Sequence, residues 1–174
     1  GLHVAADPFM NSGVTGVNGG MVVFIADDPG MHSSQNEQDS RYYAHFNLIP
    51  CLEPANQQEA YDMTRLGLEL SEEHKVPVMI RVTTRLAHSR ADVVTAEPKE
   101  QNEIKKVPRG GSFTLLPVNA RQLYKKVTEK FPTLQKLAED SPYNELVLEG
   151  KDNKVGIIST GIACNYVREA LGGT

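Results

Sequence analysis

The stretch Met21-Val-Val-Phe-Ile25 and the polar run after it, Ala26-Asp-Asp-Pro-Gly-Met-His-Ser-Ser-Gln-Asn-Glu-Gln-Asp-Ser-Arg41, decide the fold. The apolar run has the length and the β-branched content of a buried strand. The polar run is rich in acids, hydroxyls and amides, and it leads to a helix that we expect to begin near Asn36. Ligands of open α/β sheets bind outside the carboxyl ends of the strands, so this connection is a candidate binding loop.

Predicted helices and strands alternate along the first half of the sequence. The spacing of apolar residues predicts, in chain order, a helix at Ala6–Thr15, a strand at Met21–Ala26, a helix at Asn36–Phe46, a strand at Ile49–Leu52, a helix at Gln57–His74 and a strand at Val78–Val82. This order is typical of parallel strands joined by right-handed crossovers. The sequence therefore predicts an α/β fold with a parallel, doubly wound sheet.

The later elements are less regular. An amphipathic pattern predicts a helix at Asn119–Glu139, which Pro132 should kink or split because proline lacks the N–H that a helix needs. Near the end, a strand is predicted at Val155–Ile158, followed by a helix to Arg168. One strand and one helix cannot bury a sheet face, and an unpaired strand edge seeks a partner. We therefore expect exposed apolar surface here and a homo-oligomer.

These patterns divide the sequence into parts. Between the sheet-forming half and the late helix, Pro and Gly interrupt any apolar period, which indicates a linker. The predicted parts are a sheet domain at 1–90, a linker at 91–117, a connecting helical segment at 118–150 and the start of a further domain at 151–174.

Composition excludes several classes of protein. The 174 residues are 40% hydrophobic and 23% charged, as in soluble globular proteins, and no apolar run approaches a membrane span. The net charge of −4 argues against a nucleic-acid partner. Cys51 and Cys164 form no C-x-x-C motif, so we interpret them as buried reduced thiols of a cytoplasmic protein.

Polar residues follow the predicted strands. If the strands are parallel, their carboxyl ends share one edge, and polar groups that converge at such an edge can form a ligand site. The residues predicted to line this cleft are Asp27, Asp28, His32, Ser33, Ser34, Gln35 and Asn36 after the first strand, and Arg85, His88 and Ser89 after the third. Arg85 is interpreted either as a solvated charge or as a partner of Asp28. The spacing does not specify the ligand.

Each motif in this set also has other interpretations. Asp27-Asp-Pro-Gly30 is a good turn sequence in its own right. The acids of the loop and His32 are possible metal ligands, but their spacing matches no zinc or calcium motif. A hydrolase triad of Ser33, His88 and Asp28 lacks the G-x-S-x-G elbow.

The sequence resembles a known family. Gly1–Met10, Gly19–Phe46 and Val76–Arg90 are similar to the alpha subunit of indolepyruvate:ferredoxin oxidoreductase, and the similarity returns at Lys154–Leu171. The loop ADDPGMHSSQNEQDSR distinguishes this family from its pyruvate and 2-oxoglutarate relatives. The family consists of thiamine-diphosphate enzymes that oxidatively decarboxylate arylpyruvates to acyl-CoA and reduce ferredoxin.

The resemblance implies a place for this chain within a longer subunit. It corresponds to the C-terminal half of a thiamine-diphosphate pyrimidine-binding domain, a helical linker and the start of a transketolase C-terminal-like domain. The chain is then an internal fragment. Its polar loop is expected to face the cleft that holds cofactor and substrate.

Cofactors and partners follow from the same resemblance. The full-length subunit is expected to hold thiamine diphosphate, Mg²⁺ and iron–sulfur clusters, none of them bound to this fragment alone. Expected partners are a beta subunit, ferredoxin, a 2-oxo acid and CoA, with no nucleic acid and no membrane. Because the activating glutamate is expected upstream of Gly1, no catalytic residue and no metal ligand is assigned here, and the fragment alone is expected to be inactive.

A second hypothesis belongs to another class. The same fold can serve as a non-catalytic module for subunit assembly. The gene of the whole subunit discriminates between the two, because only an enzyme needs the upstream glutamate and a downstream Gly-Asp-Gly motif that holds the diphosphate.

Overall fold

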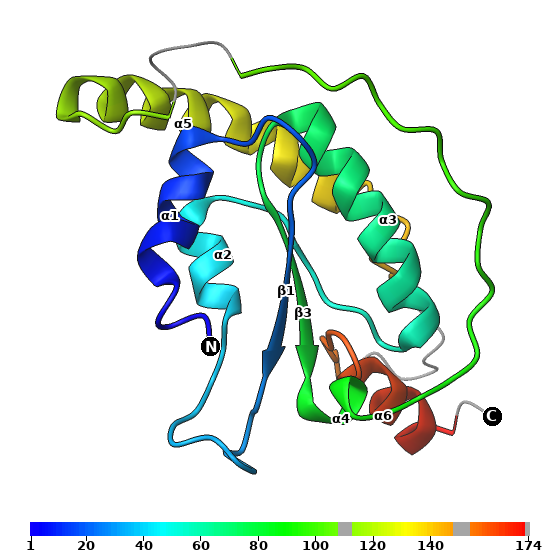
Figure 1. Cartoon of the computed structure of the whole chain (residues 1–174). Coiled ribbons are helices and arrows are strands. Elements are labelled where there is room, and N and C mark those ends of the chain that lie inside the picture. The colour runs from blue at the N-terminus through cyan, green and yellow to red at the C-terminus, as the bar shows by residue number, and fades with distance from the viewer. Residues whose placement is uncertain (108–112, 148–153, 173–174) are drawn as a thin grey trace.

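A computed structural model describes residues 1–107, 113–147 and 154–172, with a three-stranded parallel sheet at its centre (Figure 1). In their order across the sheet, the strands are β1 (Val22–Asp27), β3 (Val78–Thr83) and β2 (Cys51–Leu52). Because Asp27 lies opposite Thr83 in the register, the carboxyl ends of β1 and β3 lie side by side. The predicted α/β class and the parallel sheet are confirmed.

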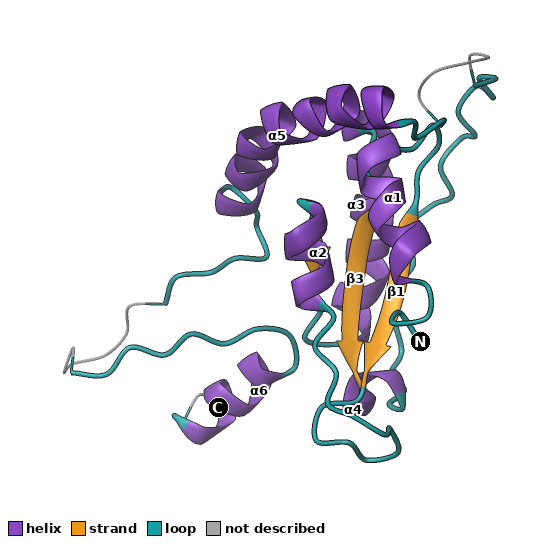
Figure 2. Cartoon of the chain, turned by 90° about the vertical axis from the view of Figure 1, so that its left-hand side faces the viewer, coloured by secondary structure: helices purple, strands orange, loops and turns teal. Residues whose placement is uncertain are grey.

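Helices lie on both faces of the sheet (Figures 1 and 2). One face carries α1 (Ala6–Thr15) and α2 (Arg41–Asn47), and the other carries α3 (Gln57–His74). On the first face, α1, α2, the sheet and one residue of a later helix, Leu134, form a core cluster. Its members are Phe9, Ile25, Ala44, Ile49, Val76, Met79 and Leu134.

Close packing and a capped amino terminus fix α3. A Cβ atom at Gly67 would lie 3.1 Å from Val22 Cγ2, so the missing side chain lets the helix approach the sheet closely. At the amino terminus, the Asn56 side chain accepts a hydrogen bond from the Glu59 N–H (2.9 Å), and the Glu59 carboxylate accepts one from the Ala55 N–H (2.7 Å). These two bonds satisfy backbone donors that a helix leaves free, which is why α3 begins where the sequence predicts.

Helix α2 begins at Arg41, not near Asn36 as predicted. The residues before Arg41 use their hydrogen-bonding groups to hold the preceding loop. Glu37 accepts from the Gly30 N–H (2.9 Å), and Gln38 accepts from the Asp28 N–H (3.2 Å). Side chains that bond to a distant backbone compete with helix formation, so the helix starts later.

Helix α5 (Pro117–Glu139) lies at the amino ends of the strands and contacts α1. It begins two residues before the predicted Asn119 and continues through Pro132 as one helix, so the predicted split is wrong. Figure 2 shows that its axis bends, as expected of a helix with an internal proline.

Residues 91–107, within the predicted linker, are extended and follow the outer side of α3, so they do not lead away from the sheet (Figure 1). Tyr61 Oη accepts a hydrogen bond from the Ala96 N–H (3.0 Å), and Arg65 donates to the Glu97 carbonyl (3.1 Å). The remaining linker residues predicted up to 117 include 108–112, which lie outside the described residues.

Two short helices lie at the carboxyl end of the sheet: α4 (Thr84–Ala87), where a loop was predicted, and α6 (Ala163–Ala170). The predicted strand at Val155–Ile158 does not form: within the described ranges these residues pair with no strand, and Ile158 is 97% exposed. Val155 and Ile157 are also exposed, so the expected exposed apolar surface is confirmed, and the homo-oligomer stays a prediction. Across the described ranges, no helix has the length and apolar character that a membrane crossing requires.

Candidate functional site at the carboxyl edge of the sheet

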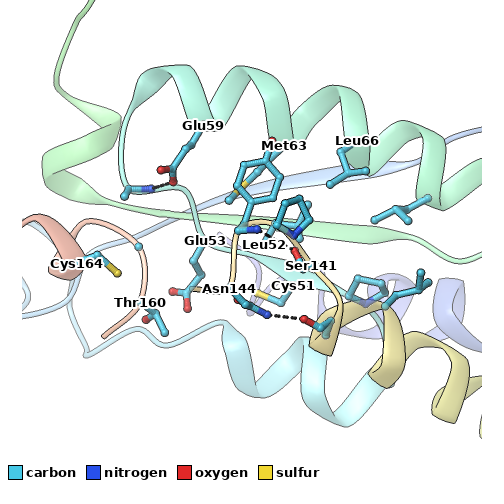
Figure 3. Close-up of a pocket in the computed structure, with 18 of the residues that line it drawn as sticks. Cys51, Leu52, Glu53, Glu59, Met63, Leu66, Ser141, Asn144, Thr160 and Cys164 are labelled. Carbon is cyan, nitrogen blue, oxygen red and sulfur yellow. Dashed lines mark hydrogen bonds between the residues drawn. The ribbon is translucent and has the colours of Figure 1, made fainter. Parts of the chain in front are cut away.

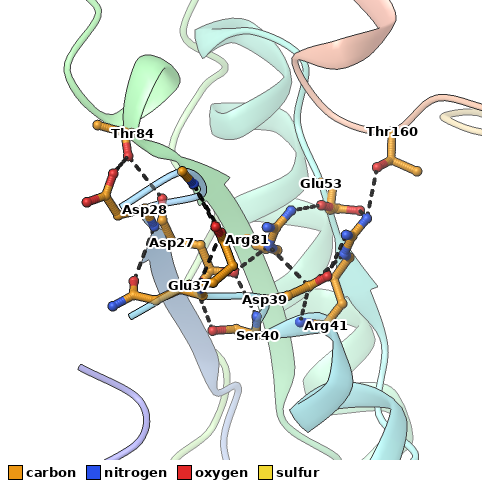
Figure 4. A network of polar contacts seen from close by, with 12 residues as sticks. Asp27, Asp28, Glu37, Asp39, Ser40, Arg41, Glu53, Arg81, Thr84 and Thr160 are labelled. Carbon is orange, nitrogen blue, oxygen red and sulfur yellow. Dashed lines mark hydrogen bonds and ion pairs between the residues drawn. The ribbon is translucent and has the colours of Figure 1, made fainter. Parts of the chain in front are cut away.

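The loop after β1 and the segment after β3 meet at one edge of the sheet, as predicted (Figure 4). The Thr84 hydroxyl, at the start of α4, donates to Asp28 Oδ1 at 2.7 Å and also lies 3.3 Å from the Asp27 carbonyl oxygen. Because parallel strands end at the same edge, residues 56 positions apart in sequence come into direct contact.

Asp27 is buried, and hydrogen-bond donors occupy its carboxylate. Oδ2 accepts from the Ser40 N–H (2.7 Å) and from Arg81 Nε (2.5 Å), and Oδ1 accepts from the Ser40 hydroxyl (2.6 Å). This carboxylate therefore joins the end of β1 to β3 and to the start of α2. The structure assigns Asp27 to the support of the cleft rather than to its open surface.

Arg81 is the centre of this network. Its side chain is only 7% exposed, and Nη1 donates to Glu53 Oε1 at 2.6 Å while Nε binds Asp27. Hydrogen bonds to these two carboxylates raise the pKa of Arg81 against the opposing effect of burial. A buried guanidinium needs counter-ions, and its two carboxylate partners here join the ends of all three strands.

Arg41 extends the network to the surface. Nε and Nη2 bind the two Asp39 oxygens at 2.7 and 2.6 Å, a bidentate pair that lowers the pKa of Asp39. Nη1 lies 3.4 Å from the Thr160 hydroxyl, its acceptor, and 3.8 Å from Glu53 Oε2. The network thus connects the sheet to the segment that precedes α6.

Asp28 shapes the polar loop. Its Oδ2 accepts hydrogen bonds from the backbone N–H groups of Ser33 (2.8 Å) and Ser34 (3.0 Å). These donors, together with Thr84, hold the pKa of Asp28 well below its usual range. The turn interpretation of this motif is also correct, since Gly30 has a φ of 81°, which glycine adopts without strain.

The remaining predicted residues lie on or near the open surface of this edge. His32, Gln35 and Asn36 are exposed and make no hydrogen bond through their side chains within the described residues. Arg85 donates to Tyr166 Oη (2.9 Å) and stacks over its ring, so the alternative pairing with Asp28 is wrong. The other predicted residues at this edge are Ser33, Ser34, His88 and Ser89, of which only Ser34 is partly buried.

Four residues of the network were not predicted: Ser40, Arg41, Arg81 and Thr160. The signal for Arg81 was present, since it is a charge within the apolar run Val78-Met-Ile-Arg-Val82. A charge in a buried strand needs a counter-ion, and Asp27 lies 54 positions away. Nothing local to either residue indicates that they meet.

A cavity of about 430 Å³ adjoins the network (Figure 3). It lies between β2, α3 and the end of α5, and residues 141–144 and 159–168 contribute to its walls. Glu53 and Thr160 belong both to the network and to the cavity lining. The polar edge and the cavity therefore form one continuous region.

The fold and this edge define a class: an α/β protein with a parallel sheet, with exposed polar residues and a cavity at the carboxyl ends of the strands. Open α/β sheets bind small molecules in this position. No protein-family model matches the chain, and no solved structure matches it at a significant level.

Curated relatives identify the family. Indolepyruvate oxidoreductase subunit IorA is 43% identical over 173 residues in Methanothermobacter marburgensis, 44% over 180 in Thermococcus kodakarensis and 39% over 173 in Archaeoglobus fulgidus. Each alignment covers 98% of this chain, which spans about 28% of the length of the first of these relatives and 27% of the others. Nearly the whole of this chain is therefore similar to one part of the IorA subunit, and the predicted resemblance is confirmed.

Proposed function

We propose that this chain is part of a thiamine-diphosphate-dependent oxidoreductase that converts indolepyruvate and related arylpyruvates to acyl-CoA and reduces ferredoxin. Within that subunit, the sheet at residues 1–90 acts as the C-terminal half of the pyrimidine-binding domain. Residues 91–117 are a linker, 118–150 a connecting helical segment and 151–174 the start of a transketolase C-terminal-like domain. A beta subunit completes the enzyme.

The proposal rests on the presence of two kinds of polar residue at the sheet edge, buried residues that support it and exposed residues that are available to a ligand. Buried Asp27, Asp28 and Arg81 hold the edge, while His32 and Gln35 remain exposed and their side chains form no hydrogen bond with any residue that the structure describes. A rigid support beneath free polar groups is what a binding surface needs. We assign the exposed loop to the wall of the cofactor and substrate cleft.

The four acids at the sheet edge do not suit Mg²⁺ and a diphosphate. Donors of the chain itself engage Asp27, Asp28, Asp39 and Glu53, and the described residues contain no group of three side chains that could hold a metal ion. The ligands of the metal–diphosphate are therefore assigned to other parts of the subunit. Thiamine diphosphate supplies the carbanion chemistry, and this chain supplies position and polar contacts.

The test uses the complete subunit, assembled with its partner subunit. Indolepyruvate- and CoA-dependent reduction of a viologen dye should fall in the His32→Ala and Gln35→Ala variants, with kcat/KM lower by about tenfold or more, equivalent to about 1.4 kcal/mol. His45→Ala is the matched control, because His45 is exposed on α2 away from the loop. No turnover of indolepyruvate by the wild-type assembly would refute the function, and unchanged loop variants would refute the assignment of the loop.

A further inference from the structure

Thr84 contacts the polar loop from a different element of the fold. It is the first residue of α4, and its hydroxyl donates to Asp28 Oδ1 at 2.7 Å (Figure 4). Thr83, which precedes it, forms no side-chain hydrogen bond that caps α4. The Thr84 hydroxyl thus bonds to the loop after β1 rather than to the helix that it begins.

The two oxygens of the Asp28 carboxylate have different partners. Oδ2 accepts from the backbone N–H groups of Ser33 and Ser34, which belong to the same loop. Oδ1 accepts from Thr84, which does not belong to it. Because Asp28 is only 7% exposed, loss of the Thr84 donor would leave a largely buried oxygen in need of another partner. The Thr84 hydroxyl therefore orients the carboxylate that holds the two serine amides.

Other hydrogen bonds of the loop shape it without attaching it to the sheet. Glu37 accepts from the Gly30 N–H, and Gln38 accepts from the Asp28 N–H, so both acceptors bond within the loop itself. The bond from Thr84 differs, because it joins the loop to the end of β3 and the start of α4. It fixes where the loop lies as well as its shape.

We propose that Thr84 is a positioning residue for this loop and, resting on the proposed function, for the contacts of the loop with cofactor and substrate. The hydroxyl orients the Asp28 carboxylate, and the carboxylate holds the two serine amides. His32 and Gln35 directly flank these serines in the sequence, so the amides place both exposed side chains. A polar surface binds well only when the groups beneath it hold it in place.

Hydrogen exchange, measured by mass spectrometry on the complete subunit assembled with its partner subunit, tests the support itself. Thr84→Val keeps the shape of the side chain but removes the hydroxyl, so the amides of Ser33 and Ser34 should exchange about fivefold faster or more. Thr84→Ser keeps the hydroxyl and should retain slow exchange. Thr83→Val is the matched control, because the Thr83 side chain forms no capping hydrogen bond at α4.

Turnover of indolepyruvate by the same assemblies tests the effect on the reaction. Thr84→Val should lower kcat/KM by about fivefold or more, while Thr84→Ser and Thr83→Val should stay within about twofold of the wild type. In a background that carries both His32→Ala and Gln35→Ala, Thr84→Val should cause less than about a twofold further loss. The reason is that changes acting through the same contacts are not additive, whereas independent damage would multiply.

The outcomes separate this inference from the proposed function. Unchanged amide exchange in Thr84→Val overturns the positioning role, and so does a loss of activity that Thr84→Ser shares or that multiplies with the loop substitutions. The proposed function would survive either result if His32→Ala and Gln35→Ala still lower activity. If the wild-type assembly does not turn over indolepyruvate, the proposed function fails, and amide exchange alone decides whether Thr84 positions the loop.

Discussion

At the scale of single residues, the sheet edge is held by charges in positions where apolar side chains are usual. Arg81 lies opposite Ile25 in the register, on the face of the sheet that α2 covers. Asp27 and Glu53 approach it from the two outer strands. The three charged residues come from three separate strand ends, so the ion pairs can form only when these strand ends lie side by side.

Loss of Arg81 should therefore be costly. We expect Arg81→Met to lower the free energy of unfolding by about 3 kcal/mol, because Asp27 would remain buried without its counter-ion. Arg41→Met is the matched control: its side chain is 46% exposed, so we expect about 1 kcal/mol or less. Urea denaturation measures both, and a loss below about 1 kcal/mol for Arg81→Met would contradict the role of the network.

The hydrogen bonds of Asp28 should make the stability of the loop depend on pH. Its folded pKa is lowered, chiefly by the Ser33 N–H, below the unfolded value of about 3.9. The stabilisation is thus present above about pH 3.9 and is lost as the pH falls through the folded pKa. NMR shifts of the Ser33 and Ser34 amides should stay constant from pH 7 to about pH 4 and change only below. A midpoint above about pH 4 would exclude the proposed hydrogen bonds, and Asp28→Asn should abolish the transition.

At the scale of elements, nearby residues in the sequence determine where some helices begin, and contacts between distant residues determine where others begin. The boundary of α3 was predictable because Asn56 and Glu59 cap it within four residues. The start of α2 was not, because Ser40 binds Asp27 thirteen positions earlier. Val155–Ile158 has strand-forming residues, but none of the strands in the described part of the chain lies beside it. The β propensity of a residue depends on packing against such neighbours.

We predict that a hydrogen bond to Tyr61 holds the extended segment against α3. Tyr61→Phe removes the acceptor of the Ala96 N–H but keeps the ring. One net hydrogen bond contributes about 1 kcal/mol, so amide exchange at Ala96 should accelerate about fivefold. Tyr124→Phe, at an exposed position of α5, serves as the control. Equal exchange at Ala96 in both variants would show that this segment is not held by α3.

At the scale of the whole molecule, the sequence predicted the sheet and the meeting of its two polar loops, but not the contacts of the C-terminal segment. Asn165 donates to the Ala55 carbonyl (2.8 Å), and Tyr166 receives Arg85. These contacts join residues 81 to 110 positions apart, beyond the reach of any periodic pattern. They bring residues 159–168 against the sheet and so form one wall of the cavity.

The central claim is that this chain supplies one polar wall of a cofactor cleft whose metal and diphosphate ligands lie elsewhere in the subunit. Calorimetry with thiamine diphosphate and Mg²⁺, on this 174-residue chain and on the complete subunit, tests it most directly. We predict binding to the complete subunit and an affinity weaker by about 10³-fold or more for this chain, at 1.4 kcal/mol per decade. Micromolar binding of the cofactor to this chain alone would contradict the account.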